Sequence, residues 1–249
     1  MSGTRSRFPK APATSRSAIL VSHGQPSQPE IAEAELSDFC AQVAALMPDW
    51  SVVSATMANP GAISKALHAA GPNPLIYPVF MTDGWFTRTA LPERLANTNV
   101  RILAPFGVDP SLIPLTARRL HDKLNDKGWK TEETCLIVAA HGSGRSRNSA
   151  HNTRAFANAL HAVTGFGDLR VGFIEEAPHL SDVLADAGEQ AVCLPFFATK
   201  RDHVLDDLPS AINQADFKGI CLDPVGLDPS IPRLIADALI AANKKEAAA

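Results

Sequence analysis

An internal repeat limits the possible folds of this chain more than any other feature of the sequence. The His-Gly pair that begins at His23 returns at His141, 118 residues later. Further positions recur in the same order at offsets of 117 or 119 residues: Pro78 as Pro195, Pro92 as Pro209, and Gly107 as Gly226. Segments that recur in order at a nearly constant offset indicate a duplication. We therefore expect two related halves, residues 18–128 and 129–243.

Composition and charge exclude several classes of protein. Residues 1–17 and 244–249 have no apolar periodicity, so we expect two unstructured tails. The 249 residues carry a net charge of −3, which gives no general basic field for a nucleic acid. No apolar run reaches the roughly 18–20 residues of a membrane span, and no apolar stretch follows Met1 as in a secretory signal. We expect a cytoplasmic protein that binds neither nucleic acid nor membrane.

Each half alternates short apolar runs with segments of helical periodicity. The second half opens with the run CLIVAA, which ends at His141, and continues with the helical segment NSAHNTRAFANALHAV. Such alternation is typical of parallel sheets covered by helices on both faces. The predicted fold class is α/β, with two similar parallel-sheet αβα halves that face a central cleft.

Three polar side chains of the second half follow the ends of predicted strands. They are His141, Glu175 and His203. The carboxyl ends of parallel strands meet at one edge of a sheet, so we expect these groups to converge. Two imidazoles and a carboxylate suit a divalent transition metal, and they suit proton transfer equally well. The spacing leaves both roles open.

Basic side chains flank the two histidines although the protein is acidic overall. The segment HGSGRSR opens a helix, where backbone N–H groups can hold an anion, but it lacks the pattern of a nucleotide-binding loop. A ligand with carboxylates would suit this local positive charge; charges that are simply solvated are the alternative. The candidate substrate-binding residues are Ser143, Arg145, Lys200 and Arg201.

The motifs of the second half resemble those of the sirohydrochlorin chelatase family, the class II tetrapyrrole chelatases of cobalamin and siroheme synthesis. The resemblance covers nearly the whole chain between the tails. The family motifs are an opening His-Gly-Ser, a Phe-Leu-Glu followed by a proline, and a Pro-Leu-Phe with a histidine eight residues after that proline. The corresponding segments here are His141-Gly142-Ser143, Phe173-Ile174-Glu175 with Pro178, and Pro195-Phe196-Phe197 with His203.

This resemblance implies a reaction as well as a fold. The expected reaction inserts Co²⁺ or Fe²⁺ into sirohydrochlorin or a related tetrapyrrole without ATP. His141, His203 and Glu175 would hold the metal or take up pyrrole protons, while the basic residues would bind peripheral carboxylates. Trp85 and Phe86 of the opposite half would pack against the ring. The metal is a substrate, so no permanently bound cofactor is implied.

The first half departs from these motifs. His23 is retained there as a secondary candidate, but Gln25 replaces the serine, and Met57 and Phe86 stand at the positions of Glu175 and His203. We therefore predict a degenerate site in residues 18–128 and the working site in residues 129–243. Arg201 also replaces a glycine that is common in the family.

Two other functions remain open. A non-catalytic protein that binds metal or tetrapyrrole would also explain the degenerate half, whereas a histidine phosphatase lacks support because no Arg-His-Gly start is present. Because two fused halves would supply internally what a single half gains by dimerising, we expect a monomer.

Overall fold

The computed structural model describes residues 16–142, 147–200 and 203–247, with the side chains of 147, 148, 203 and 245–247 outside the description. Its strands are β1 (Arg16–Ser22), β2 (Trp50–Thr56), β3 (Leu75–Pro78), β4 (Arg101–Ile102), β5 (Cys135–Ala140), β6 (Asp168–Phe173), β7 (Ala191–Pro195) and β8 (Ile220–Cys221). Its helices are α1 (Pro29–Ala45), α2 (Ala62–Ala70), α3 (Leu91–Arg94), α4 (Leu112–Lys127), α5 (Arg147–Thr164), α6 (Leu180–Ala185), α7 (Leu208–Gln214) and α8 (Ile231–Ala247).

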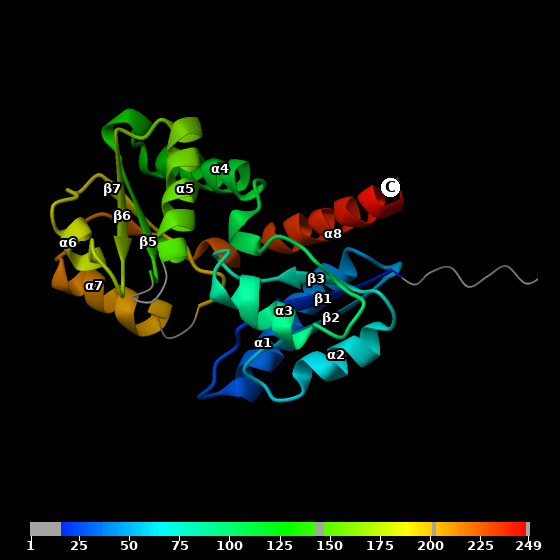
Figure 1. Cartoon of the computed structure of the whole chain (residues 1–249). Helices are drawn as coiled ribbons and strands as arrows, with labels where there is room; N and C mark the ends of the chain where they lie inside the picture. Colours follow the sequence, from blue (N-terminus) through cyan, green and yellow to red (C-terminus); the bar gives the residue numbers. More distant parts are fainter. Residues whose placement is uncertain (1–15, 143–146, 201–202, 248–249) are drawn as a thin grey trace, which may run out of the picture.

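The strands form two parallel sheets of four, which confirms the predicted fold class. The sheet orders are β2-β1-β3-β4 and β6-β5-β7-β8, the same order twice. Figure 1 shows the two sheets in separate parts of the molecule. The central strands β1 and β5 are buried along almost their whole length, in agreement with their continuous apolar runs.

The repeat extends to irregular details. A π-helical turn begins at Phe86 in the first half, and another begins at His203 in the second. Each turn leads directly into a short helix with a proline in its first turn, α3 or α7. The backbone places of Phe86 and His203 therefore correspond, as the sequence predicts.

Both expected tails are shorter than predicted. Strand β1 begins at Arg16 because Arg16 and Ser17 already pair with Trp50 and Ser51 of β2. At the other end α8 continues to Ala247, beyond the predicted limit at residue 243.

The last helix of each half lies against the other half. Helix α4 follows the first sheet in sequence but packs on α5, while α8 follows the second sheet and packs on α1 (Figure 1). Arg119 of α4 strengthens this exchange, since its guanidinium donates to the carbonyl of Asp223 at 2.9 Å.

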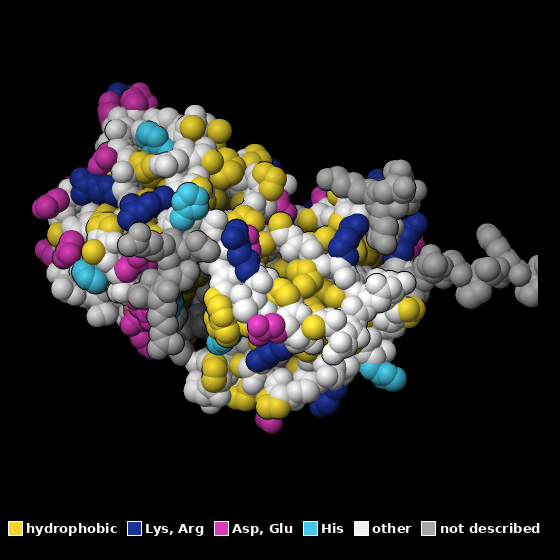
Figure 2. Space-filling model, in the orientation of Figure 1, with side chains coloured by type: hydrophobic (Ala, Val, Ile, Leu, Met, Phe, Trp, Pro, Cys, Tyr) yellow, Lys and Arg dark blue, Asp and Glu magenta, His cyan; other side chains and the backbone are white. Residues whose placement is uncertain are grey.

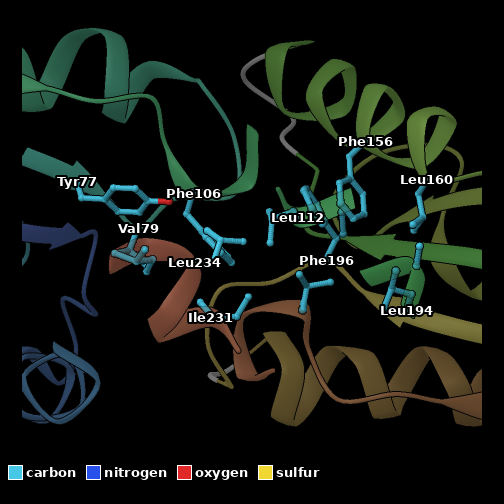
Figure 3. Packing of buried hydrophobic residues seen from close by; sticks show 14 of the residues in the cluster. Tyr77, Val79, Phe106, Leu112, Phe156, Leu160, Leu194, Phe196, Ile231 and Leu234 are labelled. Carbon is cyan, nitrogen blue, oxygen red and sulfur yellow. The ribbon is translucent and has the colours of Figure 1, made fainter. Parts of the chain in front are cut away.

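One hydrophobic core joins the two halves as a result. A single buried cluster contains residues of both sheets together with Leu112 of α4 and Leu234 of α8. Figure 3 shows Leu234 near Phe106 of the first half, and Leu112 near Phe156 of the second. The outer face of each sheet has a smaller cluster of its own, covered by local helices. The relative position of the halves is thus fixed by packing.

No helix within the described residues is both long and apolar enough to cross a membrane. On the face shown in Figure 2, basic and acidic side chains are interspersed among the described residues.

Candidate active site between the two halves

The carboxyl ends of the central strands of both sheets open into one cavity of about 840 Å³. This volume is in the usual range for small-molecule sites. His23 follows β1 and His141 follows β5, and both side chains line this cavity. The duplication therefore places one histidine from each half at a shared site.

His141 forms the centre of the second-half wall. Its Nδ1 lies 3.0 Å from the carbonyl oxygen of Gly142. Because a carbonyl only accepts, Nδ1 carries the proton when this bond forms, and Nε2 is the nitrogen that can bind a metal. The carboxylate Oε1 of Glu175 lies 3.6 Å from Nε2. Two of the predicted site residues are thus brought together.

Glu175 reaches His141 from the end of the neighbouring strand. The backbone N–H of Glu175 donates to the carbonyl of His141 at 2.9 Å, which fixes the loop after β6 against the loop after β5. The carboxylate is half-exposed and does not line the cavity itself. Gly142 has a positive φ, and a Cβ atom there would lie 2.9 Å from the side chain of Glu176. Both acidic residues therefore pack around this loop.

The first-half wall has the same backbone arrangement as the second-half wall but lacks the carboxylate beside the histidine. The Nδ1 atom of His23 lies 3.0 Å from the carbonyl oxygen of Gly24. The N–H that donates to the carbonyl of His23 belongs to Ala58, so Ala58 is the structural counterpart of Glu175. The predicted counterpart, Met57, is wrong by one residue because the offset between the halves is 118 along β1 and β5 but 117 along the whole of β2 and β6.

A guanidinium group lies close to His23. Arg94 donates a hydrogen bond to the carbonyl of Met57 at 2.5 Å. Burial lowers the pKa of His23, and the positive charge of Arg94 lowers it further, although the hydrogen bond with Gly24 opposes both effects. Phe86 covers the ring of His23, with the two ring centroids 4.3 Å apart. The neutral form of His23 is therefore favoured.

The remaining predicted residues are placed less completely. Lys200 is exposed and does not line the cavity. Ser143, Arg145 and Arg201 lie outside the described residues, as does the side chain of His203, whose backbone begins the π-helical turn after β7. Among the described side chains, no three His, Cys, Asp or Glu residues form a metal-binding group.

Most of the cavity wall consists of residues that the sequence analysis did not assign to a site. Aromatic rings dominate it, and two hydroxyl groups from α5 add polar contacts. The aromatic residues are Phe80, Trp85, Phe86, Phe196 and Phe197, and the α5 residues are Ser149 and Thr153. Of these residues, Trp85 and Phe86 were predicted to contact the ligand. Ser149 and Thr153 were not predicted, and only their four-residue spacing, which puts them on one face of a helix, could have indicated that both hydroxyls lie at the same site.

A polar link joins the two walls. The N–H of Asp83, in the loop before Trp85, donates to the side-chain oxygen of Asn152 on α5 at 3.0 Å. Arg88 forms an ion pair with Asp83 at 2.7 Å and lowers the pKa of its carboxyl group. The loop that carries Trp85 is therefore held against the second half.

Comparison with known proteins agrees with this geometry. The family model CbiX matches residues 135–242. A solved structure of CbiX, described as the terminal enzyme for biosynthesis of siroheme in denitrifying bacteria, is 44% identical, with a TM-score of 0.83 over 91% of this chain and 99% of that one. This chain belongs to the CbiX family of sirohydrochlorin chelatases.

Two proteins that are less similar in sequence also match this chain, one of them by its fold. SirB from Bacillus subtilis, solved with Fe³⁺, is 14% identical with a TM-score of 0.75 over 93% of this chain and 98% of that one. A probable sirohydrochlorin cobaltochelatase of Halobacterium salinarum is 21% identical over 162 residues, which span 54% of this chain and 55% of that protein. The CbiX family model covers the half that contains His141, Glu175 and His203.

Two glycines support the cavity walls in this member of the CbiX family. A Cβ atom at Gly107 would lie 2.0 Å from the carbonyl oxygen of Met81, and one at Gly226 would lie 2.1 Å from that of Ala198. We expect Gly107→Ala and Gly226→Ala each to lower the free energy of unfolding by about 3 kcal/mol, the upper end for overpacking. Urea denaturation measures this, with Gly84→Ala as a control because its Cβ meets nothing closer than 3.6 Å. Wild-type stability in either variant would contradict the close contact between that glycine and the carbonyl oxygen of Met81 or Ala198.

Proposed function

We propose that this protein inserts a divalent metal, Co²⁺ or Fe²⁺, into sirohydrochlorin or a related tetrapyrrole of siroheme or cobalamin biosynthesis, without ATP. The observation that carries the proposal is the pair of His141 and Glu175 at the edge of a large aromatic cavity. An imidazole and a carboxylate suit borderline divalent metals, and aromatic walls suit the faces of a large conjugated ring. The family resemblance supports the same reaction.

We assign the metal to the second half of the chain. His141, with Nε2 available and Glu175 beside it, would present the ion to the ring, and His203 would be the third ligand. The metal is consumed as a substrate, so a weak site of few ligands is sufficient. Phe196 and Phe197 would exclude water from the ring as the metal loses its hydration shell.

The ring substituents would be bound at the rim of the cavity. Sirohydrochlorin carries carboxylates at its periphery, and basic side chains bind such groups strongly. We propose Ser143, Arg145, Lys200 and Arg201 for this role. The exposed position of Lys200 fits a rim contact better than a contact inside the cavity.

We also propose that the protein acts as a monomer. The cavity takes one wall from each half of the same chain, and the shared core fixes those walls relative to each other. No second chain is needed to complete the arrangement that the described residues form.

An anaerobic absorbance assay tests the proposed function. Purified protein is mixed with sirohydrochlorin in excess and with either Co²⁺ or Fe²⁺, in the absence of ATP. We expect many equivalents of metallated product per protein molecule, at a rate above that of the protein-free mixture. Spectral change limited to one equivalent would instead indicate a protein that binds metal or tetrapyrrole without turnover.

A further inference from the structure

Two cysteines of the second sheet lie side by side and do not line the cavity. Cys193 of β7 and Cys221 of β8 are direct register partners in neighbouring parallel strands. Register partners point to the same face of a sheet, and adjacent strands lie about 4.8 Å apart. A disulfide joins residues whose Cα atoms are about 4.4–6.8 Å apart. The backbone therefore holds these two residues at a separation that a disulfide can span.

The two thiols form a short chain of hydrogen bonds. The thiol of Cys193 donates to the sulfur of Cys221. The sulfur of Cys221 in turn lies 3.6 Å from the carbonyl oxygen of Leu222, to which its own thiol donates. The two sulfur atoms are therefore already in contact while both cysteines are reduced.

Access from solvent differs between the two thiols. Of the four cysteines in the chain, Cys221 is exposed and the other three are buried. Cys193 has no exposed surface at all. Burial also raises the pKa of Cys40 and of Cys135 to about 11 in each case. A reagent dissolved in water therefore meets Cys221 first.

The hydrogen bond between the two thiols also makes Cys221 the more acidic one. It lowers the pKa of Cys221, although burial and the charge of Asp223 act in the opposite direction. The same hydrogen bond raises the pKa of Cys193, and burial raises it further. The thiolate is the nucleophilic form of cysteine, and an accessible thiol of low pKa beside a second thiol is typical of reversible oxidation. Cys221 thus suits the attacking role and Cys193 the resolving role.

We propose that Cys221 and Cys193 form a reversible oxidation site, at which hydrogen peroxide converts the two thiols into a disulfide. The Cys221 thiolate attacks one peroxide oxygen, the O–O bond breaks, and the other oxygen leaves as hydroxide and takes up the proton that Cys221 released. The sulfur of Cys193 then attacks the resulting sulfenic acid, the S–O bond breaks, and hydroxide leaves with the Cys193 proton as water. The thiols lose two electrons, and the peroxide is reduced to two molecules of water. This site is independent of the proposed chelatase function.

Mass spectrometry of the full chain tests the proposal. One molar equivalent of hydrogen peroxide is added to the reduced, metal-free protein, which is then denatured, alkylated and digested. We expect the intact protein to lose two hydrogen atoms and the digest to contain a peptide cross-linked between Cys193 and Cys221. Dithiothreitol should restore both thiols. Four alkylated cysteines after peroxide treatment, or a disulfide that contains Cys40 or Cys135, would overturn the proposal.

Single variants assign the two roles. In Cys193→Ala the reaction should stop at the sulfenic acid of Cys221, which dimedone traps. In Cys221→Ser, a change at an exposed position, we expect no cross-link and peroxide consumption at least about 10-fold slower, because the remaining thiols are buried. Wild-type peroxide consumption by folded Cys221→Ser would refute the attacking role of Cys221.

Cys135→Ala is the matched control. Cys135 of β5 pairs with Ala191, two residues before Cys193, so its side chain lies on the same face of the sheet and is the nearest alternative partner. The Cys193–Cys221 cross-link should form in this variant as in the wild type. Because the experiment contains neither metal nor tetrapyrrole, its failure leaves the proposed function intact, and an absence of turnover in the absorbance assay leaves the oxidation site intact.

Discussion

Replacing His141 with alanine should lower the rate of metallation by at least about 100-fold, because general acid–base and ligand groups contribute effects of this size. His141 is the only described histidine of the cavity that has a carboxylate within 4 Å. The variant removes the nitrogen that we propose as the metal ligand and leaves Glu175 without its imidazole. Because the side chain is only half-buried, the fold should survive the change. The measurement is the anaerobic assay at saturating tetrapyrrole, together with Co²⁺ titration of the free protein.

Co²⁺ affinity tests whether the metal binds to the second half of the chain. We expect His141→Ala to weaken Co²⁺ binding, whereas His23→Ala leaves it unchanged. Glu175→Gln should weaken Co²⁺ binding less, by roughly 10-fold, because the amide keeps the shape of the side chain and removes only its charge. A 10-fold change in affinity corresponds to about 1.4 kcal/mol. His151→Ala, an exposed histidine of α5, is the control. Full activity in His141→Ala would move the working site to the first half.

The sequence predicts the parts of the site that depend on local pattern. Apolar runs that end in His-Gly place His23 and His141 at the ends of β1 and β5, because buried strands of parallel sheets are continuous in apolarity. The repeat then implies that both halves have the same strand order. Neither inference needs knowledge of contacts between the halves.

No pattern in the sequence predicts that α4 packs against the second half and α8 against the first. Each helix has an apolar face, and that face would fit its own sheet as well as the other one. Only the three-dimensional packing decides between them. The same reason explains why the link from Asp83 to Asn152 was not predicted: it joins residues 69 positions apart, and neither belongs to a recognisable motif.

The residue equivalent to Glu175 in the first half shows a different limit of prediction from sequence. Aligning the halves at a single offset gives Met57 as the counterpart of Glu175, but hydrogen bonding to the preceding histidine loop gives Ala58. An offset that changes by one residue within a repeat reverses the face to which side chains point. The conclusion that the first half lacks this carboxylate holds for either residue.

A chain that ends at Ser230 should fail to form a cooperatively folded protein. It lacks α8, whose fully or largely buried residues cover the first sheet although they follow the second in sequence. Full burial of an aliphatic side chain contributes about 1.5–3 kcal/mol, so the loss of several approaches the whole stability of about 5–15 kcal/mol of a typical domain. The residues removed are Ile231, Leu234, Ile235, Ala236 and Leu239.

Graded variants make this prediction quantitative. Leu120 of α4 and Leu239 of α8 occupy corresponding positions and are both fully buried in the shared cluster. Leu120→Ala and Leu239→Ala should each cost about 2–5 kcal/mol in urea denaturation. A chain ending at Lys244 is the control, because it keeps all five buried residues of α8 and should unfold at the wild-type urea concentration.

The exchange also predicts how separated halves behave. Residues 16–128 lack α8, and residues 129–249 lack α4, so each fragment alone exposes the sheet face that the absent helix covers. We expect either fragment alone to be aggregated or unfolded by circular dichroism, and the two expressed together to form a one-to-one complex that binds Co²⁺. A single fragment that folds cooperatively would show that its own helix can return to its own sheet, and that the shared core is not required for the fold. Because the cavity has one wall from each half, the complex and not either fragment should carry the activity.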